Sequence, residues 1–310
     1  MTENIVVTGG SGMIGSNLVN RLVRDGQNVY NIDNLSGGSF NSLTDNNFIY
    51  CDVSNRQKLF DVLDYICPSI IFHCAAHFAN QNSVDYPLSD INDNLNALIN
   101  ILDYAKMHNV KVIFTSSSCV YGNNLEIMSV DSELKPYDTP YAINKFAGEL
   151  YCKYYNNTFG VQLNIVRIFN TYGPGELPGK YRNVIPNFFK LALSADDLVI
   201  TGTGSERRDF TFVDDTIELL MKASHSNYWN ADVFNAGTGQ STEISNLAKK
   251  IKNLTQSSSK IVYTDRRKWD HVPVRVSDIT HSKKCLDYSP SISLDEGLRR
   301  THLWLQTRLG

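Results

Sequence analysis

The sequence lacks a long apolar run, and it lacks an excess of charge of either sign. Its 29 Lys and Arg residues and 32 Asp and Glu residues give a formal net charge of −3 at pH 7. Because no large positive potential results, we expect neither nucleic acid nor an anionic membrane surface as a partner. No apolar stretch approaches the roughly 20 residues that a membrane-spanning helix needs, so we expect no membrane span.

Cysteine is scarce and scattered. The chain has six cysteines in 310 residues, and no two of them form a CxxC pair. This spacing excludes a zinc knuckle and disfavours a disulfide framework, so we predict no metal site and a reducing compartment. The first residues also lack the basic segment, apolar stretch and cleavage site of a secretory leader. We therefore expect a cytoplasmic protein.

The first half of the chain alternates short apolar runs with amphipathic stretches. With 42% hydrophobic and 20% charged residues, the composition is that of an ordinary globular protein. The periodicity predicts strands at Asn4–Thr8, Gln27–Ile32, Phe48–Tyr50, Ser69–His73, Lys111–Ser116 and Val161–Arg167, and helices at Gly12–Asp25, Ser54–Tyr65 (with Ser54 as N-cap), Asp90–His108 and Pro140–Phe159. Strand–helix–strand units of this kind form a doubly wound parallel sheet, the α/β architecture of Rossmann domains.

After Asn170 the pattern changes to a glycine- and proline-rich loop and then to shorter, mixed elements. The predicted elements here are helices at Ile185–Ser194, Val213–Ser224, Glu243–Leu254 and Leu294–Thr307, and a strand at Leu198–Ile200. We therefore divide the chain into a nucleotide-binding domain, residues 1–170, and a smaller α/β C-terminal substrate lobe, residues 171–310. We expect the two parts to exchange segments.

Glycines at Gly9, Gly12 and Gly15 form a GxxGxxG loop between the first strand and the first helix. Glycine there permits a tight turn, close approach of the backbone to a pyrophosphate and close helix–strand packing. Met13 and Ile14 lie in the first turn of the predicted helix, so their N–H groups would face the phosphates. A glycine turn without a ligand is the alternative, and its place between strand and helix makes that alternative the weaker one.

An acidic residue, Asp33, ends the second strand, eighteen positions after Gly15. A carboxylate there accepts hydrogen bonds from the hydroxyls of an adenosine ribose and repels a 2′-phosphate, which favours NAD over NADP. Asn34 beside it, and Asp52 and Val53 after the third strand, complete the predicted adenosine side of the cofactor site.

Tyr141 and Lys145 form a YxxxK pattern at the start of a predicted helix. Residues i and i+4 share a helix face, so the lysine ammonium can favour the phenolate and lower the tyrosine pKa. A phenolate is a usable general base for a substrate hydroxyl. The hydroxyls of Thr115–Ser118 follow the fifth strand and emerge at the same sheet edge, where ligands bind in open α/β sheets.

Together these motifs resemble those of the extended short-chain dehydrogenases/reductases, specifically the nucleotide-sugar epimerase/dehydratase family. The resemblance covers nearly the whole chain and rests on TGGSGMIG from Thr8, IDNLSGG from Ile32, FHCAA from Phe72, SSSCVYG from Ser116, PYAINK from Pro140, RIFNTYGPG from Arg167 and RRDFTFVDD from Arg207. It implies bound NAD, a nucleoside-diphosphate sugar as substrate, most simply a UDP-hexose, and a homodimer formed by the helices Asp90–His108 and Pro140–Phe159.

The resemblance also implies roles for single residues. Tyr141 would be the base, Lys145 its partner, and Ser117 the hydroxyl that binds the sugar 4-OH. Further cofactor contacts would come from Tyr141 and Lys145 themselves and from Ala75, Ala76, Asn94 and Phe169, the last against the nicotinamide. The diphosphate, the nucleoside and the sugar would be held by Asn170, Asn183, Arg208, Arg267 and Asp270.

The family's opening step is removal of the 4-OH proton and transfer of the C4 hydride to NAD⁺. Its dehydratases then use Asp and Glu directly after the catalytic Ser or Thr, and its decarboxylases resemble the Glu-bearing pattern. This chain has Ser118 and Cys119 there, which disfavours both reactions. The simplest outcome is epimerisation at C4, as in the subgroup of UDP-glucose 4-epimerases.

Two departures from that subgroup leave the sugar open. Phe78 stands where those epimerases carry a lysine, and Arg275 lies close to the position that gates the C2 and C6 substituents. An epimerase for a deoxy, amino or uronic sugar in surface polysaccharide synthesis is therefore an alternative. Others are a 4-keto reductase, a 2- or 3,5-epimerising relative, and a non-catalytic NAD-binding regulator, which would have no need of the intact Ser117, Tyr141 and Lys145.

Overall fold

The central feature of the computed structural model, which describes residues 3–37, 47–78, 80–124 and 127–309, is a seven-stranded sheet. Its order is β3-β2-β1-β4-β5-β6-β9, and every neighbouring pair is parallel. The strands are β1 (Asn4–Thr8), β2 (Asn28–Asp33), β3 (Phe48–Tyr50), β4 (Ile70–His73), β5 (Lys111–Ser117), β6 (Leu163–Ile168) and β9 (Asn230–Ala236). The predicted doubly wound fold is confirmed. Strand order reverses between β1 and β4, so a crevice for ligands is expected at their carboxyl ends.

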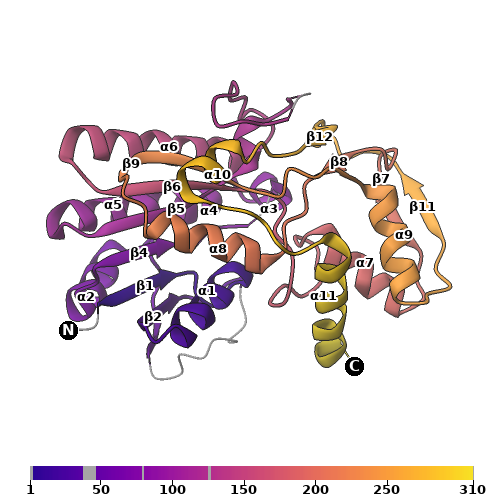
Figure 1. Cartoon of the computed structure of the whole chain (residues 1–310), viewed down its shortest axis with the longest axis horizontal. Helices are drawn as coiled ribbons and strands as arrows, with labels where there is room; N and C mark the ends of the chain where they lie inside the picture. Colours follow the sequence, from indigo (N-terminus) through magenta and orange to yellow (C-terminus); the bar gives the residue numbers. More distant parts are fainter. Residues whose placement is uncertain (1–2, 38–46, 79, 125–126, 310) are drawn as a thin grey trace.

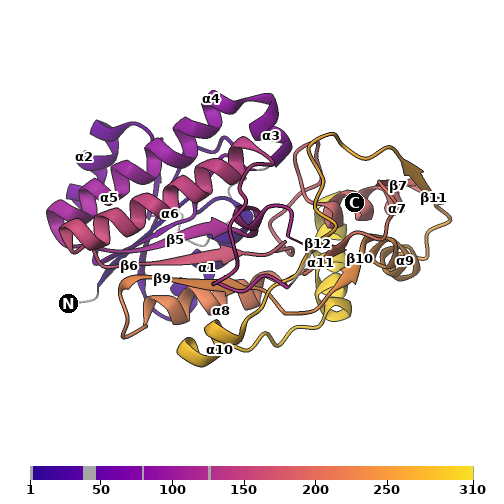
Figure 2. The ribbon, with the colours of Figure 1, turned by 90° about the horizontal axis from the view of Figure 1, so that it is seen from above.

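Helices cover both faces of this sheet (Figures 1 and 2). One face carries α1 (Met13–Arg24), α8 (Val213–Ser224) and α10 (Thr280–Leu286), and the other carries α2 (Arg56–Ile66), α5 (Ala97–His108) and α6 (Pro140–Phe159). Alternate residues of a strand face opposite layers, so Val7 packs with Leu18 of α1 while Val6 packs with Leu59 of α2. Two apolar cores result, one on each side of the sheet.

The second half of the chain is shared between this layered part and a lobe. It supplies β9, α8 and α10 to the layers, so the spatial division does not run at residue 170. The lobe holds α7 (Val184–Leu193), α9 (Ile244–Leu254), α11 (Leu294–Leu309), a parallel pair of β7 (Leu198–Thr201) and β11 (Ile261–Thr264), and a small sheet of β10 (Thr242–Glu243), β8 (Arg207–Arg208) and β12 (Val274–Arg275). The sequence pattern did not predict β9, because its polar residues interrupt the apolar run.

One long predicted helix, Asp90–His108, is broken in the structure. It consists of α4 (Pro87–Asp90), a π-helical turn η2 (Ile91–Asn96) and α5, and a short α3 (Asn80–Asp85) precedes it. Within the turn, the buried Asn94 donates from Nδ2 to Asp90 Oδ1 over 2.8 Å. Single π turns inside helices often accompany functional sites, and this one lies beside α6.

The N-cap of α2 also differs from the prediction. Asn55 caps the helix by accepting from Lys58 N over 3.2 Å, while Ser54 donates to Asp52 instead. Gly38, the last residue of the IDNLSGG segment, lies outside the described residues. Across the described ranges, every helix is too short or too polar to cross a membrane.

Candidate active site

At two of the three glycines in the loop, close packing leaves no room for a side chain. Gly9 has φ +69°, and a Cβ there would lie 2.6 Å from Ala75 N. A Cβ on Gly15 would lie 2.0 Å from Gly9 O, so the loop could not approach the helix. At Gly12 a Cβ would meet only Gly9 O at 3.4 Å, so packing alone does not require glycine there. Close approach of a ligand would require glycine at this position, because a side chain there would block access to the backbone N–H groups of the first turn.

The helix behind the loop is suited to an anion. Gly12 caps α1 without a side-chain hydrogen bond, and the first turn, which includes Met13 and Ile14, contains no acidic residue. The first N–H groups of an α-helix have no partner within the helix and carry a partial positive charge. This end of α1 therefore fits the pyrophosphate of NAD.

Asp33 lies at the opposite side of the loop. Its Oδ2 accepts from Ser11 N over 2.9 Å and its Oδ1 from Leu35 N over 2.7 Å, so the carboxylate is held at the end of β2. Asn34 accepts from Ser36 N over 3.0 Å, and Asp52 accepts from Ser54 N over 2.9 Å. Val53 is buried in the apolar core on the α2 side. The fixed Asp33 carboxylate fits an adenosine ribose and disfavours a 2′-phosphate.

Asp33→Ala should weaken NAD binding and relax the preference for NAD over NADP, because both the hydroxyl acceptor and the repelling charge are lost. We expect the ratio of NADP to NAD dissociation constants to fall by about 10-fold or more, as for a charge-assisted hydrogen bond. This ratio is measured by titrating the protein, after its bound NAD has been removed, with NAD and separately with NADP. An unchanged ratio would show that Asp33 does not read the ribose.

Ser117, Tyr141 and Lys145 come from two neighbouring elements. Ser117 ends β5, and Tyr141 and Lys145 lie in the first turns of α6, whose N-terminus is set by Pro140 and by Thr139 accepting from Ala142 N. Lys145 is 1% exposed, and its Nζ donates to Thr115 O over 3.0 Å and lies 5.7 Å from the centre of the Tyr141 ring. Ser117 Oγ accepts from Cys119 N over 3.2 Å, and this hydroxyl also lowers the pKa of Tyr141.

Burial shifts the pKa values of both Lys145 and Tyr141. Burial lowers the pKa of Lys145 to about 8, against the nearby Asp90 charge, which raises it. Burial also raises the pKa of Tyr141, with Cys119 and Asp90 adding to the rise and the Ser117 hydrogen bond opposing it. This differs from the predicted lowering by Lys145. Spacing on a helix shows that two side chains share a face, but it does not show how deeply the phenol is buried.

A buried carboxylate that the sequence analysis missed supports this pair. Asp90 is fully buried, accepts from Asn94 Nδ2 over 2.8 Å, and accepts from Asn144 Nδ2 over 2.6 Å. Asn144 lies next to Lys145 on α6, so Asp90 joins the π turn to the catalytic helix. Burial raises the pKa of Asp90, while its bond to Asn144 and the positive charges near it lower it. We therefore expect Asp90 to act as a positioning residue, through its bond to Asn144 and through its charge.

Asp90→Asn should shift the whole pH profile of turnover to lower pH. The Asp90 charge raises the pKa of both Lys145 and Tyr141. Removing this charge therefore lowers both pKa values. The part of the pH profile that follows deprotonation of Lys145 and the part that follows deprotonation of Tyr141 should both move to lower pH. The measurement is kcat against pH. A purely structural role predicts lower kcat at every pH with both limbs in place, and that result would contradict the electrostatic role.

The other predicted cofactor residues occupy different environments. After β4, Ala75 is half-buried and Ala76 is exposed, and Ala75 N donates to Thr8 Oγ1 over 3.4 Å. Asn94 keeps its Oδ1 buried without a hydrogen-bond partner among the described residues. Phe169, in contrast, has no exposed surface and packs with Tyr121 at a ring distance of 5.9 Å. The structure therefore does not bring Phe169 to a ligand surface, because it fills the small core behind β6.

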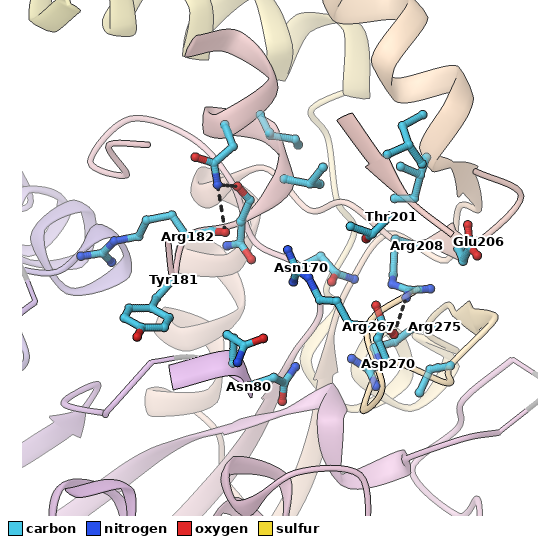
Figure 3. A pocket seen from close by; sticks show the side chains of 18 of the residues that line it. Asn80, Asn170, Tyr181, Arg182, Thr201, Glu206, Arg208, Arg267, Asp270 and Arg275 are labelled. Atoms are coloured by element: carbon cyan, nitrogen blue, oxygen red, sulfur yellow. Dashed lines mark hydrogen bonds and ion pairs between the residues drawn. The ribbon is translucent and has the colours of Figure 1, made fainter. Parts of the chain in front are cut away.

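An open cleft lies between the sheet edge and the lobe. The catalytic elements contribute Cys119, Thr139 and Ala142 to its wall. Ser117, predicted to contact the sugar, is not among the lining residues. The structure does bring together the other predicted substrate residues in this cleft: Asn170, Asn183, Arg208, Arg267 and Asp270 (Figure 3).

Several of the predicted substrate residues form hydrogen bonds or ion pairs within the protein. Arg208 Nη2 lies 3.5 Å from Asp270 Oδ1. Asn170 donates from Nδ2 to Asp209 O over 3.0 Å. Asn183 donates from its side chain to the buried Glu176 over 3.2 Å, so its amide nitrogen is held inside the fold. The side chains of Arg208, Arg267 and Asp270 line the cleft.

The cleft also contains residues that the sequence analysis did not assign to a substrate. They include Asn80, Asp138, Tyr181, Thr201, Trp269 and Arg275. Trp269 donates from Nε1 to Gln81 over 2.8 Å, which ties the loop after β11 to α3. The short α3 has no strong helical pattern, so no sequence signal indicated that it would face the lobe. Arg275 was noted only as a departure from a family position.

Comparison with known proteins agrees with this geometry. Residues 5–237 match the model of the NAD dependent epimerase/dehydratase family. The chain is 32% identical to the UDP-N-acetyl-alpha-D-glucosaminuronate decarboxylase of Bacillus cytotoxicus, over 99% of the chain and 98% of that protein. It is 32% identical to the UDP-glucose 4-epimerase of Mycolicibacterium smegmatis, over 96% of each. Its structure superposes on a UDP-glucose 4-epimerase of Thermotoga maritima solved with UDP-glucose, with TM-score 0.94 and 30% identity over 99% and 100% of the two chains.

Proposed function

The chain belongs to the NAD-dependent epimerase/dehydratase family, and from that premise we propose that it epimerises C4 of a nucleoside-diphosphate hexose of the UDP-glucose/UDP-galactose type. It is an enzyme of nucleotide-sugar metabolism, and its cofactor is NAD. The observation that carries the proposal is the Ser117–Tyr141–Lys145 group at the end of β5, followed by Ser118 and Cys119. Neither of these two side chains is the acid of a dehydratase or decarboxylase pattern.

In the proposed reaction Tyr141 removes the proton from the sugar 4-OH, and Ser117 holds that hydroxyl by a hydrogen bond. Lys145 stabilises the resulting phenolate, and Asp90 favours the charged form of Lys145. The oxidised nicotinamide supplies a hydride acceptor and a positive charge when NAD is bound. Tyr141 later returns the proton to the same oxygen, after the 4-keto sugar has turned its other face.

The residues of the lobe would bind the unreactive part of the substrate. Arg208 and Arg267 offer guanidinium forks that match phosphate oxygens better than lysine would. Asp270, beside Arg208, would accept hydrogen bonds from the hydroxyls of the nucleoside ribose. Asn170 and Asn183 would contact the phosphate or the sugar. Binding through the diphosphate leaves the sugar free to rotate, which a 4-epimerase requires.

We also propose a homodimer through the outer face of α5 and α6 and a cytoplasmic location. Large apolar side chains are exposed along α6, where Ile143 is 48%, Leu150 is 51% and Tyr154 is 51% exposed. Such a stripe on one helix is an interface pattern rather than a solvent pattern. All six cysteines are free, as expected in a reducing compartment.

The test uses the purified protein without added cofactor. It is incubated separately with UDP-glucose and with UDP-galactose, and the products are resolved by NMR. Interconversion in both directions, with NAD released on denaturation, is the expected result. Net consumption of NADH or NADPH by a 4-keto sugar would instead indicate a reductase. Retained NAD without conversion of any nucleotide hexose would contradict the proposal.

A further inference from the structure

Of the six cysteines, all of which the structure describes, Cys119 is the one that lines the substrate cleft. It follows Ser117 by two residues, is 7% exposed and packs in one small cluster with Tyr141 and Ala142. Its sulfur therefore lies on the side of the cleft where Tyr141 must meet the sugar C4 hydroxyl. The reaction proposed above gives this sulfur no role.

Three of the other cysteines are in surroundings that keep a thiol unreactive. Burial raises the pKa of Cys74 to about 12, that of Cys152 well above its ordinary value, and that of Cys51 as well. The thiolate is the reactive form of cysteine, so burial protects these three sulfurs. Cys67 is exposed at the C-terminal end of α2 and Cys285 is half-buried on α10, and neither is among the described residues that line the cleft.

Hydrogen-bond donors surround the sulfur of Cys119. Arg275 donates to it from Nη1 at 3.5 Å, and Asn80 donates to it from Nδ2 at 3.4 Å. Arg275 is 8% exposed, and its Nε is buried without a hydrogen-bond partner in the described parts of the chain. Figure 3 shows Asn80, Arg208 and Arg275 in the wall of the same cleft. A buried donor without a partner is costly, and an oxygen atom on the neighbouring sulfur could serve as its acceptor.

The positive charges of the site act on this sulfur. Burial lowers the pKa of Arg208 to about 10, and the Arg275 charge lowers it as well, whereas a negative charge on Cys119 raises it. A negative charge on Cys119 also opposes the lowering of the Lys145 pKa by burial. Such coupling is mutual, so the same cations favour a negative charge on the sulfur. Electropositive surroundings of this kind are typical of reactive cysteines.

A chemical change at Cys119 would reach the catalytic helix in two ways. Asn80, which donates to the sulfur, accepts from Thr139 Oγ1 over 2.9 Å, and Thr139 is the N-cap of α6. Burial raises the pKa of Tyr141, and a negative charge on Cys119 raises it further, which disfavours the phenolate that acts as base. An oxygen atom added to the sulfur would also occupy part of the cleft.

We propose that Cys119 is a modification site, at which a peroxide oxidises the thiol to a sulfenic acid and stops turnover until a small thiol restores it. The sulfur attacks one peroxide oxygen, so that the O–O bond breaks and an S–O bond forms. The sulfur gives up two electrons, and the other peroxide oxygen leaves as water with the thiol proton. One molecule of a small thiol then displaces water to form a mixed disulfide, and a second molecule releases the Cys119 thiol. The effect on turnover rests on the proposed function, whereas the oxidation itself does not.

The oxidation is tested by treating the purified NAD-loaded protein with hydrogen peroxide in the presence of dimedone, which traps sulfenic acids. Mass spectrometry of the peptides gives the rate of labelling at each cysteine. Cys119 should be labelled at least about 10-fold faster than the exposed Cys67. Absence of label at Cys119, or a rate no higher than at Cys67, would overturn the proposal.

Variants of two arginines separate the role of Arg275 from a general effect on the fold. Arg275→Gln should slow the labelling of Cys119 by about 10-fold or more, because a positive charge beside the sulfur is lost. Arg207→Gln changes a nearby arginine on β8, which is 55% exposed and lies 3.7 Å from Glu243, and it should leave the rate unchanged. Unchanged labelling in Arg275→Gln, or an equal loss in both variants, would contradict the role of Arg275 and with it the proposal.

Two alkylating reagents, iodoacetate and iodoacetamide, test the positive charges independently of oxidation. They differ in that iodoacetate carries a carboxylate, which the cations around Cys119 should attract. The ratio of the iodoacetate rate to the iodoacetamide rate should be about 10-fold higher at Cys119 than at Cys67, and it should fall in Arg275→Gln. Equal ratios at the two cysteines would contradict the proposed surroundings of the sulfur.

Turnover is measured as interconversion of UDP-glucose and UDP-galactose, with each protein compared with its own untreated rate. Peroxide should lower turnover in step with the oxidation of Cys119, and dithiothreitol should restore it. The Cys119→Ser variant should lose no activity on the same treatment. Oxidation of Cys119 with unchanged turnover would overturn the proposal. A protein without activity on UDP-hexoses would contradict the proposed function, while the labelling rates still decide whether Cys119 is the modification site.

Discussion

Turnover of the Tyr141→Phe variant should be about 100- to 10,000-fold lower than that of the unaltered enzyme, while NAD stays bound. The variant keeps the ring that packs with Cys119 and Ala142 and loses only the phenol oxygen. Without that oxygen the proposed base for the 4-OH proton is lost, and Lys145 Nζ is already donating to Thr115 O. The cofactor contacts of the glycine loop and Asp33 are on other elements, so NAD content should be unchanged.

The measurement pairs initial rates with NAD released from the denatured protein. Tyr151→Phe is the matched control, because Tyr151 lies on the same helix with its side chain 39% exposed. It should turn over at the normal rate. If Tyr141→Phe also keeps a rate within about threefold of normal, Tyr141 is not the base, and the proposed roles of Ser117 and Lys145 are contradicted as well.

The second large effect is on stability. Glu149→Gln should lower the free energy of unfolding by about 3–5 kcal/mol, because it leaves a buried guanidinium without its charge partner. Glu149 accepts from Arg167 Nη2 over 2.7 Å and Nε over 2.9 Å, and both side chains are 2% exposed or less. Burial by itself would lower the pKa of Arg167, but the bonds to Glu149 raise it above its ordinary value. A neutral amide has one acceptor where the carboxylate had two.

This pair also joins several elements of the sheet. Arg167 on β6 donates to Tyr121 over 2.8 Å, Tyr121 donates to Asn235 on β9 over 2.8 Å, and Ser116 on β5 donates to Glu149 on α6 over 2.6 Å. Loss of the carboxylate therefore loosens the contact of α6 with the strands that hold the catalytic serine.

Denaturant unfolding followed by circular dichroism measures the change. Glu296→Gln is the control, since Glu296 forms surface ion pairs with Arg299 and Arg300, and exposed pairs contribute little. The double variant Glu149→Gln, Arg167→Met should recover part of the loss, because no unpaired charge remains buried. A single Glu149→Gln variant as stable as the unaltered protein would contradict the assigned role of the pair.

The features that sequence reasoning predicted correctly depend on neighbours along the chain. The parallel sheet follows from alternating strands and helices, and the reason is local geometry and the right-handed connection of parallel strands. The glycine loop is similar at Gly15, since the atom that a Cβ there would meet belongs to Gly9 of the same loop. The bounds of α6 were predicted as Pro140–Phe159, because proline starts the helix and Gly160 ends it.

Features that failed or were missed depend on residues far apart in sequence. The strand β9 has a poor apolar pattern and exists because β6 offers an unpaired edge. The raised pKa of Tyr141 comes from burial under several elements, and Phe169 is enclosed by segments around Tyr121 and Val272. No spacing rule contains such information.

The sequence by itself therefore determined the family and its cofactor NAD, and it predicted the NAD site and the catalytic group, because each prediction rests on a short motif whose residues are brought together by one turn or one helix. Only the tertiary structure decided what surrounds them. It bonded Asp90 to Asn144, next to Lys145 on α6, paired Glu149 with Arg167, and set Arg275 beside Cys119 across 156 positions of chain. The physical reason is that burial and charge pairing depend on which distant segments pack together, and those two quantities set the proton affinity of each group.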